Sequence, residues 1–150
     1  MAVTSKLDAA LEDLSAALWQ LRHLLDLLRF RLEEERLLEA AGGRRWLPGA
    51  SREIEAVVDQ LRLADLVRAV SSEELARILG TGSPATLPQL AAAAPGPWGH
   101  ILGLHHEALS EAVDAVTRLA GERSRAAGEA PPTVRIGPSL ADFLGAPRAR

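Results

Sequence analysis

The sequence predicts an all-α fold, an antiparallel helical bundle of three main helices with one or two short helices and a flexible C-terminal tail. Leucine recurs at alternating steps of four and three residues near the N-terminus, a spacing that defines one side of a long helix. No segment alternates like a strand, since Val134 and Ile136 lie in a brief stretch bounded by prolines. We therefore expect a helical bundle over residues 1–128 and a Pro/Gly-rich disordered tail over residues 129–150.

The first helix is expected to run from Thr4 or Ser5 to Ala41, where Gly42 and Gly43 end it. Its leucine seam consists of Leu7, Leu11, Leu14, Leu18, Leu21, Leu25, Leu28 and Leu32. Every seam position is leucine and the chain has no Asn, so nothing in the seam fixes one register or one oligomeric state. Such a seam suits a helix that packs inside its own bundle, or one that takes up another protein's amphipathic helix.

A second apolar face lies roughly opposite the seam on the same helix. It is formed by Trp19, Leu27 and Phe30, with His23 between them and with Leu37 and Leu38 as an extension. A surface helix of a small bundle is usually polar on its back. Two interpretations remain open: a short segment or the tail covers this face, or the face is an exposed surface that binds a helix.

The middle of the chain contains a connector and two or three shorter helical segments. We expect Arg44–Gly49 to be the connector, with Leu47 forced out of helical geometry by Pro48 and with Ser51 as the N-cap of a helix to about Val70. The Ser71-to-Glu74 spacing either starts a short helix or marks a kink. The Thr86-to-Gln89 spacing predicts a capping box that opens a short helix to Ala94.

The last long helix is expected to run from near Pro97 to about Arg125. Its apolar stripe is Ile101, Leu102, His105, Leu109, Ala112, Val113, Val116, Leu119 and Ala120. The tail then contains one amphipathic island, in which Leu140, Phe143 and Leu144 have i, i+3, i+4 spacing behind a possible Ser139 cap. Because an isolated helix of this length is unstable in water, the island should be ordered only when it docks on another surface.

Composition and local patterns give no indication of catalysis. The net charge is −3, there is no cysteine, and no apolar run reaches the roughly 20 residues that span a bilayer. His100, His105 and His106 lack the i, i+3 or i, i+4 spacing of metal ligands on a helix, so a hydrogen-bonded or surface histidine is expected. We expect no enzyme activity, cofactor, metal, nucleic-acid partner, membrane insertion or secretory signal.

Three stretches together resemble the FlgN-type flagellar export chaperones in their actinobacterial form. They are Phe30–Leu38 (FRLEEERLL), Gly43–Pro48 (GRRWLP) with the following Arg52–Glu55 (REIE), and Pro97-Trp98 leading into Leu102–Leu109 (LGLHHEAL). The resemblance covers about residues 14–125. Single helical stretches are weak signatures, and it is the order and spacing of the three that favour this family.

The resemblance implies a small cytoplasmic protein, monomer or homodimer, that binds the C-terminal amphipathic helices of hook-associated junction proteins. Such chaperones prevent premature assembly and deliver their cargo to the flagellar export gate. The family's C-terminal region is associated with cargo binding, a role that transfers to Leu102, His105, Leu109, Val113, Val116 and Leu119. Gate docking in relatives involves an aromatic residue near the C-terminus. This chain has no Tyr, so Phe143, with Leu140 and Leu144, is the available candidate.

Several alternatives stay open. The chain could be a structural coiled-coil protein that self-assembles through the leucine seam without cargo, although its glycines and prolines favour a folded-back bundle. A weaker alternative is a nucleic-acid or signalling adaptor that uses Arg44 and Arg45. Trp46 either packs beneath the first turn, with the two arginines capping free carbonyls, or lies in an exposed docking loop. The island could dock on the gate, which is slightly favoured, or fold back as a placeholder that cargo displaces.

Overall fold

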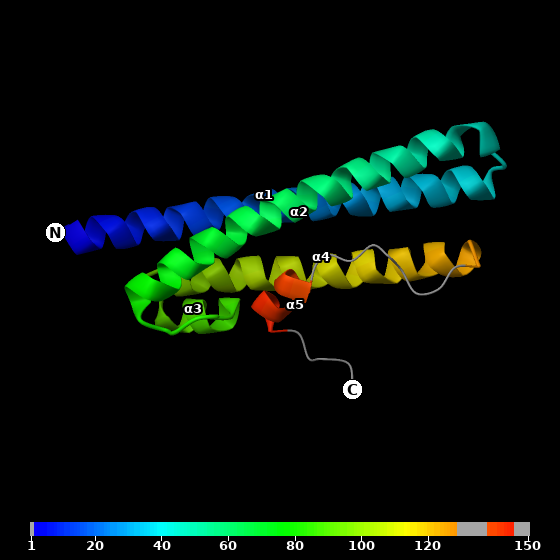
Figure 1. The fold of residues 1–150 in the computed structure, drawn as a ribbon. Coiled ribbons are helices and arrows are strands. Elements are labelled where there is room, and N and C mark those ends of the chain that lie inside the picture. The colour runs from blue at the N-terminus through cyan, green and yellow to red at the C-terminus, as the bar shows by residue number, and fades with distance from the viewer. Residues whose placement is uncertain (1, 129–137, 146–150) are drawn as a thin grey trace.

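A computed structural model describes residues 2–128 and 138–145 of the chain, and within them it contains helices and no strand (Figure 1). The elements are α1 (Ala2–Ala40), the 3-10 turn η1 (Arg44–Trp46), α2 (Leu47–Leu79), α3 (Leu87–Ala93), α4 (Trp98–Ala126) and α5 (Pro138–Leu144). The all-α prediction, with three long and two short α-helices, is confirmed. The predicted disorder of the tail concerns, in part, residues 129–137 and 146–150, which lie outside the described residues.

The three long helices alternate in direction along the chain, and both α2 and α4 pack against α1. α2 folds back along α1, while α4 runs beside α1 in the same direction (Figure 1). Side-chain contacts between α1 and α4 show the parallel course, because their sequence separation stays between 82 and 90 residues from Ser15–His105 to Arg36–Glu122. α3 packs mainly on α4.

The leucine seam forms the centre of the core, as predicted. Its members from Leu11 to Leu32 are buried, and Leu7 is partly buried against the same cluster. They pack with apolar residues of the other helices, among them Ile54, Leu75 and Leu102. Burial of a leucine side chain contributes about 1.5–3 kcal/mol. The seam is therefore used inside the chain's own bundle.

Glycines end α1 and α2 where the sequence places them. Gly42 has a φ of 74°, and the amides of Gly43 and Gly42 donate to the carbonyls of Leu38 and Glu39, a Schellman motif. Gly80 has a φ of 72° and ends α2 in the same left-handed conformation. The backbone thus satisfies the carbonyls of Leu38 and Glu39 without Arg44 or Arg45, the residues that one of the two alternatives for this connector assigned to capping.

The predicted start of the second helix is also wrong. α2 begins at Leu47, which is helical with φ −61° and ψ −41°, and not after Ser51. Pro48 lies in the first turn, where its missing N–H would have no partner in any case. The helix also continues through Ser71–Glu74 without a new start. By contrast, the Thr86 and Gln89 capping box at the start of α3 is confirmed.

Candidate helix-binding site

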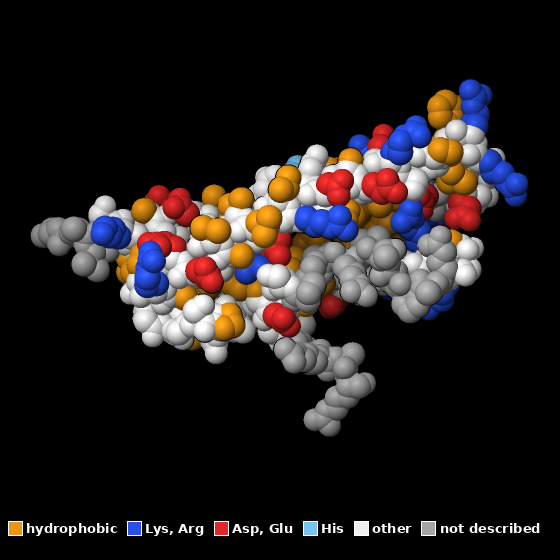
Figure 2. Space-filling view, in the orientation of Figure 1, with side chains coloured by type: hydrophobic (Ala, Val, Ile, Leu, Met, Phe, Trp, Pro, Cys, Tyr) orange, Lys and Arg blue, Asp and Glu red, His pale blue; other side chains and the backbone are white. Residues whose placement is uncertain are grey.

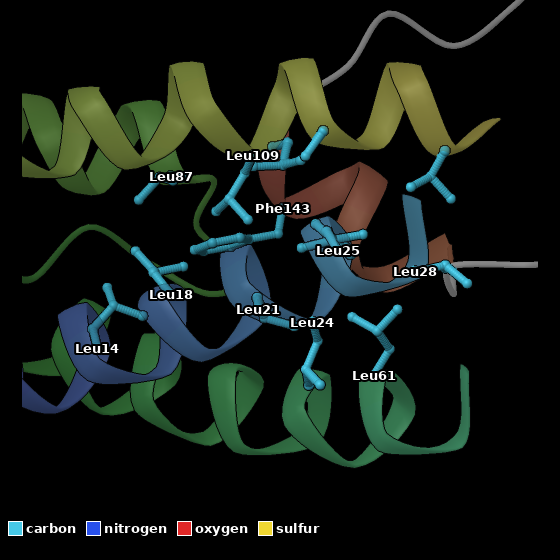
Figure 3. Close-up of a cluster of buried hydrophobic side chains, with 14 of the residues drawn as sticks. Leu14, Leu18, Leu21, Leu24, Leu25, Leu28, Leu61, Leu87, Leu109 and Phe143 are labelled. Atoms are coloured by element: carbon cyan, nitrogen blue, oxygen red, sulfur yellow. The ribbon is translucent and has the colours of Figure 1, made fainter. Parts of the chain in front are cut away.

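The amphipathic island of the tail forms α5, which packs against the bundle. Leu140, Phe143 and Leu144 are each less than 5% exposed and belong to the main core cluster. Figure 3 shows Phe143 pointing from α5 between Leu109 of α4 and the leucines of α1. The island could dock on the export gate or on the protein's own bundle, and in the structure it docks on the bundle. We call the surface beneath α5 the α5 seat.

Polar contacts hold both ends of α5. At its start, Nη2 of Arg68 in α2 donates to Oγ of Ser139 over 2.8 Å. At its end, Nε2–H of His106 in α4 donates to the carbonyl oxygen of Leu144 over 2.8 Å, because a carbonyl can only accept. The contacts come from two different helices, so α5 bridges α2 and α4.

Arg68 is a buried cation in the wall of the α5 seat, only 4% exposed. Its Nε and Nη2 donate to Oδ1 of Asp65 over 2.9 and 2.7 Å, and Nη1 makes a longer contact of 3.5 Å with Oγ of Ser72. Its Cζ lies 4.3 Å from the centre of the Phe143 ring, within the range of a cation–π interaction. Sequence reasoning missed Arg68, because an arginine inside an apolar helix pattern is usually assigned to the surface.

The stripe predicted to bind cargo is not an open groove. Leu102, His105, Leu109, Val116 and Leu119 are at most 3% exposed, and Val113 is partly buried. α1 covers this side of α4, and α5 covers part of the remainder. An outside helix would therefore reach these side chains only after another element had moved away.

His105 is a hydrogen-bonded core residue. Arg22 Nη1 lies 3.3 Å from Nδ1 and can only donate, so Nδ1 accepts and the proton resides on Nε2, which faces Oγ of Ser15 at 3.1 Å. The ring of Trp19 meets the imidazole edge-on, with 5.1 Å between ring centroids. Burial, followed by the nearby Arg22 charge, lowers the pKa of His105 from 6.5 to about 4. The imidazole is thus neutral at pH 7.

The second apolar face of α1 is partly exposed and partly covered. Trp19 and Phe30 are 56% and 58% exposed, whereas Leu27 is partly buried against the core. Trp19 is not free, because the Arg22 guanidinium stacks 4.0 Å above its ring. Trp46 at the η1 turn is 58% exposed as well, so of the two alternatives for this residue the structure has the exposed ring and not the ring packed beneath the turn.

A third apolar surface, on the solvent side of α2, was missed by the sequence analysis. It consists of Leu63, Leu66, Val67 and Val70, each between 59% and 69% exposed. Their i, i+3, i+4, i+7 spacing is the usual signal of a buried helix face, but the core-facing side of α2 carries other residues, such as Leu61 and Leu75. Figure 2 shows hydrophobic side chains gathered over the middle of α2. We call these four residues the α2 outer row.

Exposed ion pairs flank the α2 outer row at each end. Arg62 pairs with Asp59 over 3.2 Å on one side, and Arg77 pairs with Glu74 on the other. Such pairs stabilise the helix weakly and keep the ends of the row polar. The apolar part runs over the eight residues from Leu63 to Val70, seven steps of about 1.5 Å or about 10 Å in length. That length matches about two turns of a second helix.

Other kinds of site have little support in the described residues. No group of three or more His, Cys, Asp or Glu side chains in residues 2–128 and 138–145 is arranged to hold a metal ion. Over the same ranges, no helix has the length and hydropathy needed to cross a bilayer. Comparisons with protein-family models, with curated proteins and with solved structures found no match to this chain.

Proposed function

We propose that the protein is a cytoplasmic helix-binding chaperone of the FlgN type. In this proposal it holds the C-terminal amphipathic helices of hook-associated junction proteins, keeps them from assembling early and delivers them to the flagellar export gate. The three stretches that resemble the family support the cargo class. The observation that carries the helix-binding activity is the α2 outer row.

The α2 outer row has the chemistry that an amphipathic helix needs. Four large aliphatic side chains lie unpartnered on one side of a helix, and exposed apolar patches on soluble proteins commonly mark interaction sites. A cargo helix with leucines at i, i+3 and i+7 would bury this row in the helix-to-helix mode. Because the contact is apolar, binding should depend only weakly on salt concentration.

The role of the last helix in this proposal changes with the structure. The α4 stripe, from Leu102 to Leu119, supports the bundle that presents the row, and it is not the first contact for cargo. Docking of Phe143 on the export gate would require α5 to leave its seat, because the ring is 4% exposed. Gate docking through Trp46 requires no such movement, since that ring is already exposed.

The test compares one exposed position in the α2 outer row with one exposed position outside it. Leu66→Glu places a charge in the row, and Leu104→Glu, at a 48% exposed leucine of α4, is the matched control. The affinity for a C-terminal peptide of a hook-associated junction protein should fall at least tenfold in the row variant and stay unchanged in the control. Equal affinities in folded proteins would place the binding surface elsewhere.

The structural alternative, self-assembly without cargo, makes a different prediction for mass in solution. Self-assembly through the leucine seam would require the bundle to open, because the seam is already buried within one chain. A chaperone should form a defined complex with a co-expressed junction protein. A homo-oligomer of constant mass, with or without that protein, would instead favour the structural role.

A further inference from the structure

We propose that the α5 seat is a binding site for an amphipathic helix of another protein, and that α5 is a resident occupant that such a helix replaces. The partner helix carries large apolar side chains in the spacing of Leu140, Phe143 and Leu144. A hydrogen-bond acceptor precedes the first of them, where Ser139 stands. The seat lies on the core side of α2, opposite the α2 outer row, so this inference goes beyond the proposed function and does not depend on it.

The buried Arg68 defines what the seat selects. A buried guanidinium requires acceptors for its N–H groups, and here Asp65 supplies one acceptor from the same helix while Ser139 supplies another from the occupant. Phe143, four positions after Ser139, lies under the same guanidinium. The Arg68 guanidinium therefore contacts the acceptor at the start of the bound helix, a hydroxyl or a carboxylate, and an aromatic ring one helical turn later. In an empty seat, water would replace the Ser139 and Phe143 contacts of the guanidinium, and the Asp65 pair would remain.

α5 does not fill the space next to its seat. A cavity of about 490 Å³ adjoins the helix, and its wall includes Ala69, Pro84, Ala85 and Phe143. α5 has only seven residues, so a longer helix could extend along the seat and place further side chains in this cavity. The structure thus contains more binding surface than its own occupant covers.

The cavity and the buried guanidinium together describe the occupant that fits this surface better than α5. The preferred partner is an amphipathic helix longer than α5, with an acceptor at its start that meets Arg68.

Covalent attachment explains how a short helix can occupy the seat. Residues 127–137 connect α4 to α5, and a segment on a short connection acts at an effective concentration on the order of a millimolar. Weak intrinsic affinity is then enough for α5 to be bound. A separate helix at micromolar concentration replaces it only if its affinity is roughly a thousandfold higher than that of a free α5 peptide.

The first test removes the resident occupant and supplies it again as a peptide. Leu140→Glu with Phe143→Glu, in the full chain, keeps α5 out of its seat. The probe is a fluorescein-labelled peptide of about 20 residues that embeds residues 138–144 in Ala-, Glu- and Lys-rich helical flanks. It should bind the variant at least tenfold more tightly than the wild type. Arg68→Met added to the variant should reverse that gain, and a folded variant that binds no better than wild type overturns the proposal.

The second test uses the otherwise unaltered chain and decides the matter if the first variant does not fold. The chain has no cysteine, so Asp142→Cys on the exposed side of α5 can carry a single nitroxide label. The label should have the restricted mobility of a docked helix at first and become mobile when the unlabelled probe peptide is added at several millimolar, above the effective concentration of the tethered α5. A peptide with Glu at both apolar anchor positions is the control. A label that keeps its restricted mobility at saturating probe, or that responds equally to the control peptide, refutes replacement.

Discussion

Substitution of Phe143 should destabilise the protein less than its burial suggests, and the loss should reach a limit. Burial of Leu140, Phe143 and Leu144 contributes roughly 5–9 kcal/mol, at about 1.5–3 kcal/mol for each side chain. The cation–π contact and the two end contacts add about 2–4 kcal/mol. Ordering seven residues opposes these terms by about 7–14 kcal/mol. The sums are comparable, so α5 docks with only a few kcal/mol.

This small docking free energy limits what any α5 substitution can do. Truncation of a buried Phe to Ala costs about 3–5 kcal/mol when the site cannot move away. α5 can detach instead, so the loss in the free energy of unfolding cannot exceed the docking free energy. Phe143→Ala and Phe143→Asp should then have nearly equal effects of about 1–3 kcal/mol. Adding Leu140→Ala to Phe143→Ala should change little further.

Leu109 provides the contrast, because it lies within α4 and cannot detach alone. It is fully buried, so Leu109→Ala should cost about 2–5 kcal/mol and Leu109→Asp considerably more. Urea unfolding followed by far-UV circular dichroism measures all of these free energies. If Phe143→Asp proves much more destabilising than Phe143→Ala, or if the Leu140 and Phe143 losses add, then α5 is an integral part of the core and the reasoning fails.

Three further predictions concern other parts of the molecule. The free energy of unfolding should fall as the pH drops from about 6.5 to about 4, because unfolded His105 takes up a proton in that window and folded His105 does not. The loss is at most about 3 kcal/mol. In urea titrations across the same pH range, His105→Gln should remove the part of the pH dependence that His105 causes. Gly103→Ala should raise the free energy of unfolding by about 1 kcal/mol, since an added Cβ there meets open space. Gly99→Ala should lower it, because its Cβ would lie 2.8 Å from the carbonyl oxygen of Ala91 in α3. Equal effects of the two substitutions would contradict the close approach of α3 and α4. Trp46→Ala should change the melting temperature little, with a free-energy effect within about 0.5 kcal/mol, and a large drop would mean that the ring is covered in solution.

Local signals in the sequence predicted the helices well. The leucine seam, the glycine at the end of α1 and the Thr86 capping box each act within a few residues, so the sequence alone identifies them. The start of α2 was harder to predict from the sequence, because Pro48 is compatible both with a break and with a first helical turn. In that case the surrounding turn, and not the local residues, decides the outcome.

Which apolar face becomes buried could not be read from spacing. Leu140, Phe143 and Leu144 have the same i, i+3, i+4 pattern as Leu63, Leu66 and Val67, yet the first set is buried and the second is exposed. The difference arises from where the chain brings α5 and α2 relative to α1, which is a property of the assembled bundle. For the same reason the spacing of the α4 stripe did not show which helices cover it, and in the structure it is core.

The parallel course of α1 and α4 has a consequence for the order of folding. α1 and α2 form a hairpin across a short turn, whereas the residues of α4 that meet α1 follow their partners by 82 to 90 positions. Closing the larger loop costs more chain entropy, so we expect α1 to pair with α2 before it pairs with α4. During synthesis, one flank of the α1 leucines therefore remains uncovered until α4 has left the ribosome, and in that interval the nascent hairpin can capture, or be captured by, any amphipathic helix nearby.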